Sequence, residues 1–206
     1  MIVVVNSGTA NVGSIVNMLK KVGATGTITE DPEVVRRAER LILPGVGSFD
    51  AGVNAWRKLG MWDCLEEVVL QRGIPCLGVC LGMQMMCRGS EEGEQKGLGW
   101  FEADVVRLPR NTAEGVLRVP HMGWNRIVPR QMHPVLEGLT TDARFYFVHS
   151  YCVQADRAED VVASCHYGID FACAIGKNNV VAVQFHPEKS HRFGMNLMAN
   201  FVRWQP

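Results

Sequence analysis

The first half of the chain alternates short apolar runs with segments whose apolar residues recur at helical spacing. This alternation restricts the possible folds more than any other feature of the sequence. The predicted strands cover residues 2–5, 25–29, 41–43 and 75–79, and the predicted helices cover residues 15–22, a segment capped by Asp31-Pro32, and residues 50–58 and 62–71. Strands that alternate with helices predict a parallel sheet covered by helices on both faces.

The second half of the chain has a different texture, with strand-like segments joined by short connections. These segments cover residues 101–108, 124–128, 144–149, 161–166, 171–175 and 180–185, and a helix is predicted over residues 196–204. Nothing in the chain resembles a linker, a low-complexity tract or a repeat, so we expect one domain over residues 1–206. The predicted fold is a three-layer α/β sandwich, with a largely parallel central sheet plus antiparallel additions. Its ligands should gather at the carboxyl ends of the strands.

Composition and charge exclude several classes of function. Lys plus Arg equals Asp plus Glu at 21 each, so no basic excess indicates nucleic acid or an anionic membrane as a partner. We expect neither a signal peptide nor a membrane span. The seven cysteines form an odd set without a C-x-x-C pair, which favours reduced thiols in the cytoplasm. We expect no metal and no cofactor, because no metal-ligand spacing joins the Cys and His residues.

One cysteine stands at a predicted strand-to-helix corner, in Gly78-Val79-Cys80-Leu81-Gly82-Met83-Gln84. A nucleophile at such a corner projects above the sheet, and a following helix N-terminus stabilises a negative sulfur. Glycines two positions before and after the cysteine remove Cβ atoms that would clash at the tight turn. We therefore predict that Cys80 is reactive and that the Leu81 N–H donates to an oxyanion. The other six cysteines are interpreted as buried structural thiols.

His186 is the best candidate for the base that such a thiol needs. It follows the predicted strand 180–185, and Pro187 favours an extended backbone at His186. Residues two apart on an extended chain face the same way, so Glu188 could orient the imidazole while the other nitrogen faces Cys80. The alternative is a capping histidine followed by a surface glutamate. Because Cys80 and His186 are 106 residues apart, their meeting is a prediction about tertiary structure.

A second oxyanion donor could come from Pro44-Gly45-Val46-Gly47, which follows the predicted strand 41–43. Its glycines allow the backbone to approach a ligand closely or a peptide plane to rotate. The alternative is an ordinary turn.

The cysteine corner and His186-Pro187-Glu188 together resemble the class I (triad) glutamine amidotransferases. Further stretches resemble one branch of this family, the glutaminase subunits of imidazole glycerol phosphate synthase. These stretches are Pro44-Gly45-Val46-Gly47-Ser48-Phe49, Pro120-His121-Met122-Gly123-Trp124-Asn125, Phe145-Tyr146-Phe147-Val148-His149-Ser150-Tyr151 and Glu188-Lys189-Ser190. The resemblance covers the whole chain, with one departure: Asn6-Ser7-Gly8-Thr9-Ala10-Asn11 stands where the family often has an Asp-Tyr-Gly-type turn.

The resemblance implies hydrolysis of L-glutamine to glutamate and ammonia. It also implies a (βα)8-barrel cyclase partner, in a heterodimer, that uses the ammonia in histidine biosynthesis. By the resemblance, Cys80 is the nucleophile, His186 the general base and acid, and Glu188 the carboxylate that orients His186. Leu81, with Val46 or Gly47, donates to the oxyanion, and glutamine is bound by Gln84, Ser150 and Tyr151. The partner interface and the ammonia exit are formed by Trp124, Tyr146 and Lys189. Without the resemblance, Trp124 could pack in a core, Tyr146 could be a strand aromatic and Lys189 a solvated charge.

Two other functions are consistent with the same residues. A paralogous pair could supply ammonia to a different amination, such as that of a sugar nucleotide. A catalytically silent binding subunit could retain the cysteine corner for structure alone. A free-standing Cys-His peptidase or esterase is less consistent, since it would leave Gln84 and the Pro120–Asn125 stretch without a purpose.

Overall fold

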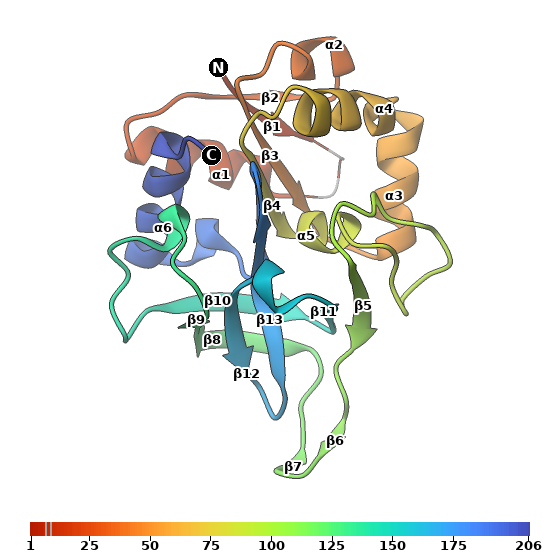
Figure 1. Cartoon of the computed structure of the whole chain (residues 1–206), viewed down its shortest axis with the longest axis vertical. Helices are drawn as coiled ribbons and strands as arrows, with labels where there is room; N and C mark the ends of the chain where they lie inside the picture. The colour runs from red at the N-terminus through yellow and green to blue at the C-terminus, as the bar shows by residue number, and fades with distance from the viewer. Residues whose placement is uncertain (7, 9) are drawn as a thin grey trace.

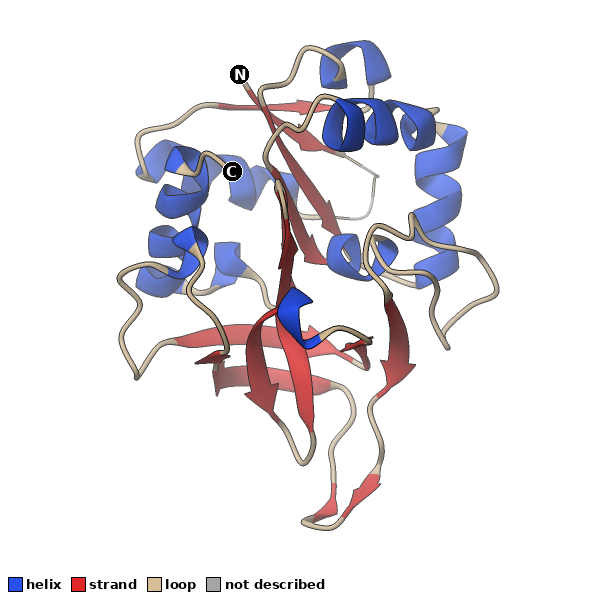
Figure 2. Ribbon diagram, viewed as in Figure 1, coloured by secondary structure: helices blue, strands red, loops and turns tan. Residues whose placement is uncertain are grey.

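A ten-stranded mixed sheet forms the centre of the molecule, in a computed structural model that describes residues 1–6, 8 and 10–206 (Figures 1 and 2). Its main path runs in the order β2-β1-β3-β4-β14-β13-β11-β5, and β12 and β9 extend it from β13. The strands of this sheet are β1 (Ile2–Val5), β2 (Gly26–Thr29), β3 (Arg40–Gly45), β4 (Cys76–Cys80), β5 (Ala103–Arg107), β9 (Val128–Pro129), β11 (Tyr151–Ala155), β12 (Val161–His166), β13 (Asp170–Lys177) and β14 (Val180–Val183).

The sheet has a parallel half and an antiparallel half that meet at β14. Strands β2, β1, β3, β4 and β14 pair in parallel, whereas β13, β11 and β5 add antiparallel pairs. Strands β1, β4 and β14 are buried at every residue, as expected of strands covered on both faces. The predicted parallel sheet with antiparallel additions is confirmed.

Helices cover both faces of the parallel half and create three layers. Helices α1 (Val12–Lys21) and α6 (His191–Arg203) pack on one face, and α3 (Phe49–Lys58), α4 (Met61–Leu65) and α5 (Leu81–Met85) pack on the other. Figure 1 shows the two groups of helices on opposite sides of β4. Each face has its own apolar core, one including Leu19, Phe185 and Phe201 and the other including Phe49 and Trp56.

Local signals explain where several helices begin. The Asn11 side chain accepts a hydrogen bond from the Ser14 N–H at the start of α1. Asp31 accepts from the Glu33 N–H at 2.9 Å, and Pro32 opens the single-turn helix α2 (Pro32–Val35). Both caps satisfy backbone donors that the first turn of a helix leaves free. The predicted cap at Asp31-Pro32 is therefore confirmed.

Other elements differ from the predicted ranges. The segment 62–71 was expected as one helix, but α4 continues into a π-helical turn, η1 (Glu66–Gln71). Strand β11 was not predicted. Strands β8 (His121–Arg126) and β10 (Arg144–His149) leave the main sheet and form a separate antiparallel ribbon. Hydrophobic spacing indicates which residues are buried, but it contains no information on where a strand bends away from its sheet.

The remaining elements are short. They are β6 (Asn111–Thr112), β7 (Gly115–Val116), and the 3-10 turns η2 (Pro134–Leu136), η3 (Ala158–Asp160) and η4 (Pro187–Lys189). Among the described residues, we find no helix with the length and apolarity needed to cross a membrane. In the Asn6–Asn11 segment, where the sequence departs from the family, Ser7 and Thr9 lie outside the described residues.

Candidate active site

Cys80 lies at the junction of β4 and α5, in a backbone conformation that L-residues rarely adopt. Its φ is 55° and its ψ is −112°. Such strain persists only where the surrounding structure enforces it, and it clusters at functional sites. Gly78 and Gly82, on either side of Cys80, allow the close packing that the corner requires. A Cβ on Gly82 would lie 1.8 Å from the Leu43 carbonyl oxygen, and one on Gly78 would lie 2.9 Å from the Ala182 Cβ. The sharp strand-to-helix corner predicted at Cys80 is present.

His186 is brought to Cys80 by the order of the central strands, because β14 pairs directly with β4. Its backbone N–H donates to the Tyr146 carbonyl at 2.9 Å, and the Ser190 hydroxyl donates to the His186 carbonyl at 2.6 Å. Nδ1 of His186 lies 2.8 Å from Oε1 of Glu188. Both side chains are buried, at 2% and 6% exposure. The Glu188 carboxylate therefore contacts the imidazole from a buried position, and the alternative of a surface glutamate is wrong.

The charge environment of His186 favours the protonated ring. Burial alone would lower the pKa of His186, but interaction with the Cys80 sulfur and the hydrogen bond to Glu188 raise it to about 9. Nε2 is buried and forms no hydrogen bond of full geometry within the described part of the chain. Of the two neighbours that raise the pKa of His186, the Cys80 sulfur has the larger effect. This arrangement supports a protonated imidazole beside the Cys80 sulfur.

Cys80 and His186 open into one pocket of ≈ 320 Å³. Ligand pockets span roughly 300–1,000 Å³, so this one suits a small metabolite. The pocket is lined by Val46, Gly47, Cys80, Leu81, Gln84, Glu92, Pro120, Val148, His149, Ser150, Tyr151 and His186. Every residue predicted for the oxyanion hole and for substrate binding is in this set. Gly47 has a φ of +102°, and a Cβ on it would contact no described atom within 4 Å, so the space beside this residue is open.

Gln84 is held beside the pocket by both hydrogens of its amide. Its Nε2 donates to the Tyr151 carbonyl at 3.1 Å and to the Gln184 Oε1 atom at 3.0 Å. The Oε1 atom of Gln84 is thus the part of this side chain that can accept a hydrogen bond from a ligand. Ser150 is fixed by its backbone, since its carbonyl accepts from the Leu108 N–H at 2.9 Å.

Three polar residues of the site were not predicted from the sequence. Glu92 lines the pocket and accepts from the Phe49 N–H at 2.8 Å. His149 also lines it, and burial lowers the pKa of His149 to about 3, which keeps this ring neutral. Gln184 is fully buried, and its Nε2 lies 3.8 Å from the Cys80 sulfur. Only Gln184 had a local signal, because it lies two residues before His186 at the end of an apolar strand.

Trp124, Tyr146 and Lys189 form a cluster behind His186, outside the pocket. Trp124 contacts Tyr146 edge-to-face at 6.1 Å between ring centroids, and the Lys189 Nζ lies 5.9 Å from the Tyr146 ring centre. Trp124 is 44% exposed, so the alternative that it packs in the core is wrong. Met122, on the same strand β8, is 62% exposed. Exposed apolar side chains of this size on one ribbon are typical of interaction surfaces.

The other six cysteines are buried, as predicted. Burial raises the pKa of the Cys152 and Cys165 thiols to about 12, and it raises the pKa of Cys76 and Cys87 further. These thiols stay protonated at neutral pH. Cys80 is distinguished from them by its pocket and by its histidine partner.

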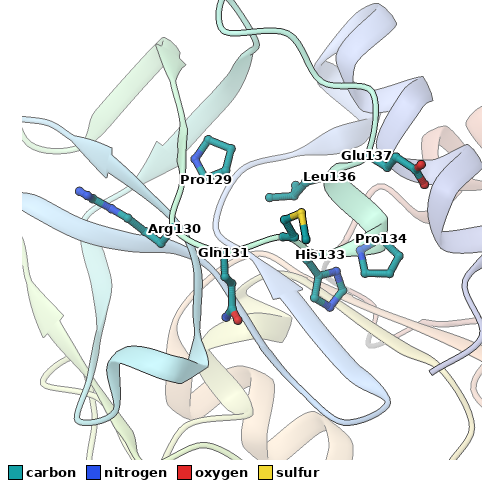
Figure 3. Close-up of a pocket in the computed structure, with 8 residues that line it drawn as sticks. Pro129, Arg130, Gln131, His133, Pro134, Leu136 and Glu137 are labelled. Carbon is teal, nitrogen blue, oxygen red and sulfur yellow. The ribbon is translucent and has the colours of Figure 1, made fainter.

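A larger cavity, of ≈ 630 Å³, lies elsewhere, along the segment between residues 129 and 137 (Figure 3). Arg130, Gln131 and His133 line it, together with the exposed Met132. None of the residues predicted to have a function borders this cavity. We therefore place the candidate active site at the smaller pocket, which is lined by Cys80, His186 and the residues predicted to bind the substrate.

Comparison with known proteins gives relatives over nearly the whole chain. The profile of the family "Glutamine amidotransferase class-I" matches residues 3–204. The "Imidazole glycerol phosphate synthase subunit HisH 2" of Pseudomonas aeruginosa is 49% identical over 202 residues, covering 98% of each chain. A protein of the same name from Methanococcus maripaludis is 44% identical and covers 98% of this chain and 99% of its own. The "Imidazole glycerol phosphate synthase subunit HisH" of Bdellovibrio bacteriovorus is 41% identical, covering 98% of each chain.

Solved structures agree on the fold. A putative GMP synthase protein from Thermoplasma acidophilum superposes with a TM-score of 0.73 at 18% identity, covering 98% of this chain and 92% of its own. The structure of PurLQS from Thermotoga maritima has a TM-score of 0.74 at 15% identity, covering 98% and 97%.

Proposed function

Because this chain belongs to the class-I glutamine amidotransferases, and within them to the HisH subunits of imidazole glycerol phosphate synthase, we propose that it hydrolyses L-glutamine through Cys80, His186 and Glu188 and supplies the ammonia to a synthase partner. The observation that carries the proposal is one shared pocket. A strained cysteine and a buried, carboxylate-bound histidine both open into it, although they lie 106 residues apart in the sequence.

The reaction starts with attack of the Cys80 thiolate on the side-chain amide carbon of glutamine. The new C–S bond pushes the carbonyl electrons onto oxygen and creates a tetrahedral oxyanion. The Leu81 N–H, with that of Val46 or Gly47, would donate to this oxygen. Each such donor contributes about 3 kcal/mol to the transition state, or about a hundredfold in rate.

Collapse of the oxyanion breaks the C–N bond, and the imidazolium of His186 gives its proton to the departing nitrogen. Ammonia leaves and a thioester remains. The now neutral His186 removes a proton from a water molecule, which attacks the thioester and releases glutamate with the Cys80 thiolate. Glu188 keeps the ring in the required orientation throughout and stabilises its charged form.

Substrate recognition follows from the polar groups around the pocket. The Oε1 atom of Gln84 and the carboxylate of Glu92 are acceptors, which suit the α-ammonium group of glutamine. The backbone around Ser150 and Tyr151 borders the same space and would hold the remaining polar atoms of the substrate.

The relatives are named as subunits of a synthase, so this chain works with a partner subunit. We propose that the partner is a (βα)8-barrel cyclase that forms a heterodimer with this chain in the cytoplasm. The cluster of the exposed Trp124 and Lys189 with the half-buried Tyr146 would be its docking surface and the exit for ammonia. Rotation of the Gly47 peptide on docking would complete the oxyanion hole, which would prevent wasteful hydrolysis.

The test is glutaminase turnover with and without the barrel subunit, together with labelling by a glutamine-analogue electrophile. We expect labelling at Cys80, release of glutamate, and a large increase in turnover on complex formation. Cys80→Ala should abolish both labelling and turnover. A wild-type protein that leaves Cys80 unlabelled would support the silent binding subunit instead.

A different client for the ammonia is the alternative that this experiment can separate. If the cognate barrel consumes ammonia in the cyclase reaction, the histidine pathway is supported. If it aminates another metabolite, such as a sugar nucleotide, the chemistry stands and the pathway assignment does not.

A further inference from the structure

Gln184 lies beside Gln84 and Cys80 in the candidate active site, and the reaction described above does not use it. The residue follows β14, is fully buried, and contacts two functional side chains. Its Oε1 accepts from Gln84 at 3.0 Å, and its Nε2 lies 3.8 Å from the Cys80 sulfur, within reach of a hydrogen bond to sulfur. A buried amide with two such neighbours links the substrate-binding residue to the nucleophile.

The orientation of this amide is fixed by a backbone carbonyl. The Tyr151 carbonyl can only accept hydrogen bonds, and it accepts one from the Gln84 Nε2 and one from the His149 Nδ1, which lies 2.8 Å away. Gln84 must therefore present its NH2 group on this side, and its second hydrogen faces Gln184. That hydrogen needs an acceptor, so Gln184 presents Oε1 to Gln84 and its own NH2 group to the sulfur.

The reversed orientation of Gln184 is disfavoured by its surroundings. It would bring two NH2 groups together in a buried space and leave their hydrogens without acceptors. Buried polar groups without partners are costly, so the network selects the orientation with a donor toward Cys80.

We infer that Gln184 is a further catalytic residue, an inference that rests on the proposed function. Gln184 donates an N–H hydrogen bond to the Cys80 thiolate. It also keeps the Oε1 atom of Gln84 free for the substrate. A neutral donor stabilises a negative sulfur without competing for the proton that His186 transfers. It acts at rest, and again when the thioester breaks and the sulfur leaves.

The test compares two variants by the pH dependence of Cys80 alkylation with iodoacetamide, located by mass spectrometry. This small neutral probe reacts with the thiolate and needs no substrate-binding groups. Gln184→Met keeps the volume and removes the donor, so the midpoint of alkylation should rise by about one pH unit, a tenfold loss of thiolate at pH values below the midpoint. Gln184→Glu also adds a negative charge near the sulfur, so its midpoint should rise further.

The control is Gln205→Glu, which adds the same charge at an exposed position near the end of the chain and should leave the midpoint unchanged. If Gln184→Glu fails to fold, as judged by thermal unfolding, the alkylation midpoint of Gln184→Met alone is compared with that of the wild type. NMR of the wild-type protein adds a measurement that needs no variant at Gln184. Blocking Cys80 as a methyl disulfide should shift the side-chain amide protons of Gln184.

The outcomes separate this inference from the proposed function. A midpoint in folded Gln184→Met that coincides with that of the wild type, or unmoved Gln184 amide protons, would overturn the role of Gln184. A wild-type protein that turns over no glutamine even with the barrel subunit bound would overturn the proposed function, whereas a raised midpoint in the variants would still support a hydrogen bond from Gln184 to the sulfur.

Discussion

At the scale of single residues, the site depends on how Glu188 and Cys80 change the proton affinity of His186. Their combined effect exceeds the effect of burial and raises the pKa of His186 to about 9. The imidazolium therefore persists through neutral pH, where it could protonate the leaving nitrogen in the proposed reaction. The pKa is higher in the folded than in the unfolded protein, so the stabilisation that comes from this group is complete below pH 6.5 and is lost as the pH rises through about 9.

Glu188→Gln removes one of the interactions that raise this pKa. We expect the pKa of His186 to fall below about 9, and we expect kcat to drop by about a hundredfold or more because the ring is less well oriented. NMR titration of the imidazole measures the first effect, and glutaminase assays measure the second.

Glu114→Gln is the matched control for this prediction. Glu114 is exposed and lies 3.1 Å from the Nε2 atom of His166. Its replacement should lower the pKa of His166 and leave His186 unchanged. An unaltered titration of His186 in Glu188→Gln would show that Glu188 does not hold the ring.

At the scale of elements, the corner between β4 and α5 depends on close contact with β3. The space over Gly82 is filled by the Leu43 carbonyl oxygen, and that over Gly45 by the Leu81 side chain. Strand β3 also leads into the predicted oxyanion segment at Val46 and Gly47. One contact between neighbouring elements thus positions both Cys80 and the groups that would stabilise the oxyanion.

Gly82→Ala should disrupt this contact, because the added Cβ would lie 1.8 Å from a backbone oxygen that cannot move alone. We expect a loss of about 3 kcal/mol or more in the free energy of unfolding, measured by denaturant titration, and loss of Cys80 labelling. Gly13→Ala in α1 is the control. Its Cβ would approach only Asn11 Oδ1, at 3.8 Å, so it should be neutral or slightly stabilising. Equal stability of the two variants would contradict this account of the corner.

At the scale of the whole molecule, the separate β8–β10 ribbon presents apolar groups next to His186. Tyr146 on β10 accepts the backbone hydrogen bond of His186, and Trp124 on β8 packs against Tyr146 and stacks on His191. A partner that binds this surface would press on the segment that carries His186 and Glu188. Docking and catalysis would thereby be mechanically connected.

Trp124→Ala should weaken binding of the barrel subunit by about 2 kcal/mol or more, as expected for a large aromatic near the centre of an interface. Alkylation of Cys80 in the isolated subunit should not change, since Trp124 does not line the pocket. Calorimetry with the barrel subunit measures the first quantity. Met132→Ala, at a fully exposed residue beside the larger cavity, should bind like the wild type. Wild-type affinity in Trp124→Ala would place the interface elsewhere.

Much of the fold could be predicted because its signals are local. Apolar runs mark β1, β3 and β4, the cap at Asp31 marks a helix start, and the glycines around Cys80 mark a tight corner. Each of these depends on neighbours in the sequence. The antiparallel half was less predictable: β11 was missed, and β8 and β10 formed a ribbon of their own.

The sequence by itself determined the parallel half of the sheet and singled out Cys80, since burial pattern and backbone crowding are properties of adjacent residues. The tertiary structure alone decided that His186 meets Cys80, because their proximity depends on β14 pairing with β4. It also decided the roles open to Glu92, His149 and Gln184, whose hydrogen bonds reach across 43, 28 and 104 positions. Contacts between distant side chains depend on strand order and register, and hydrophobic spacing records neither.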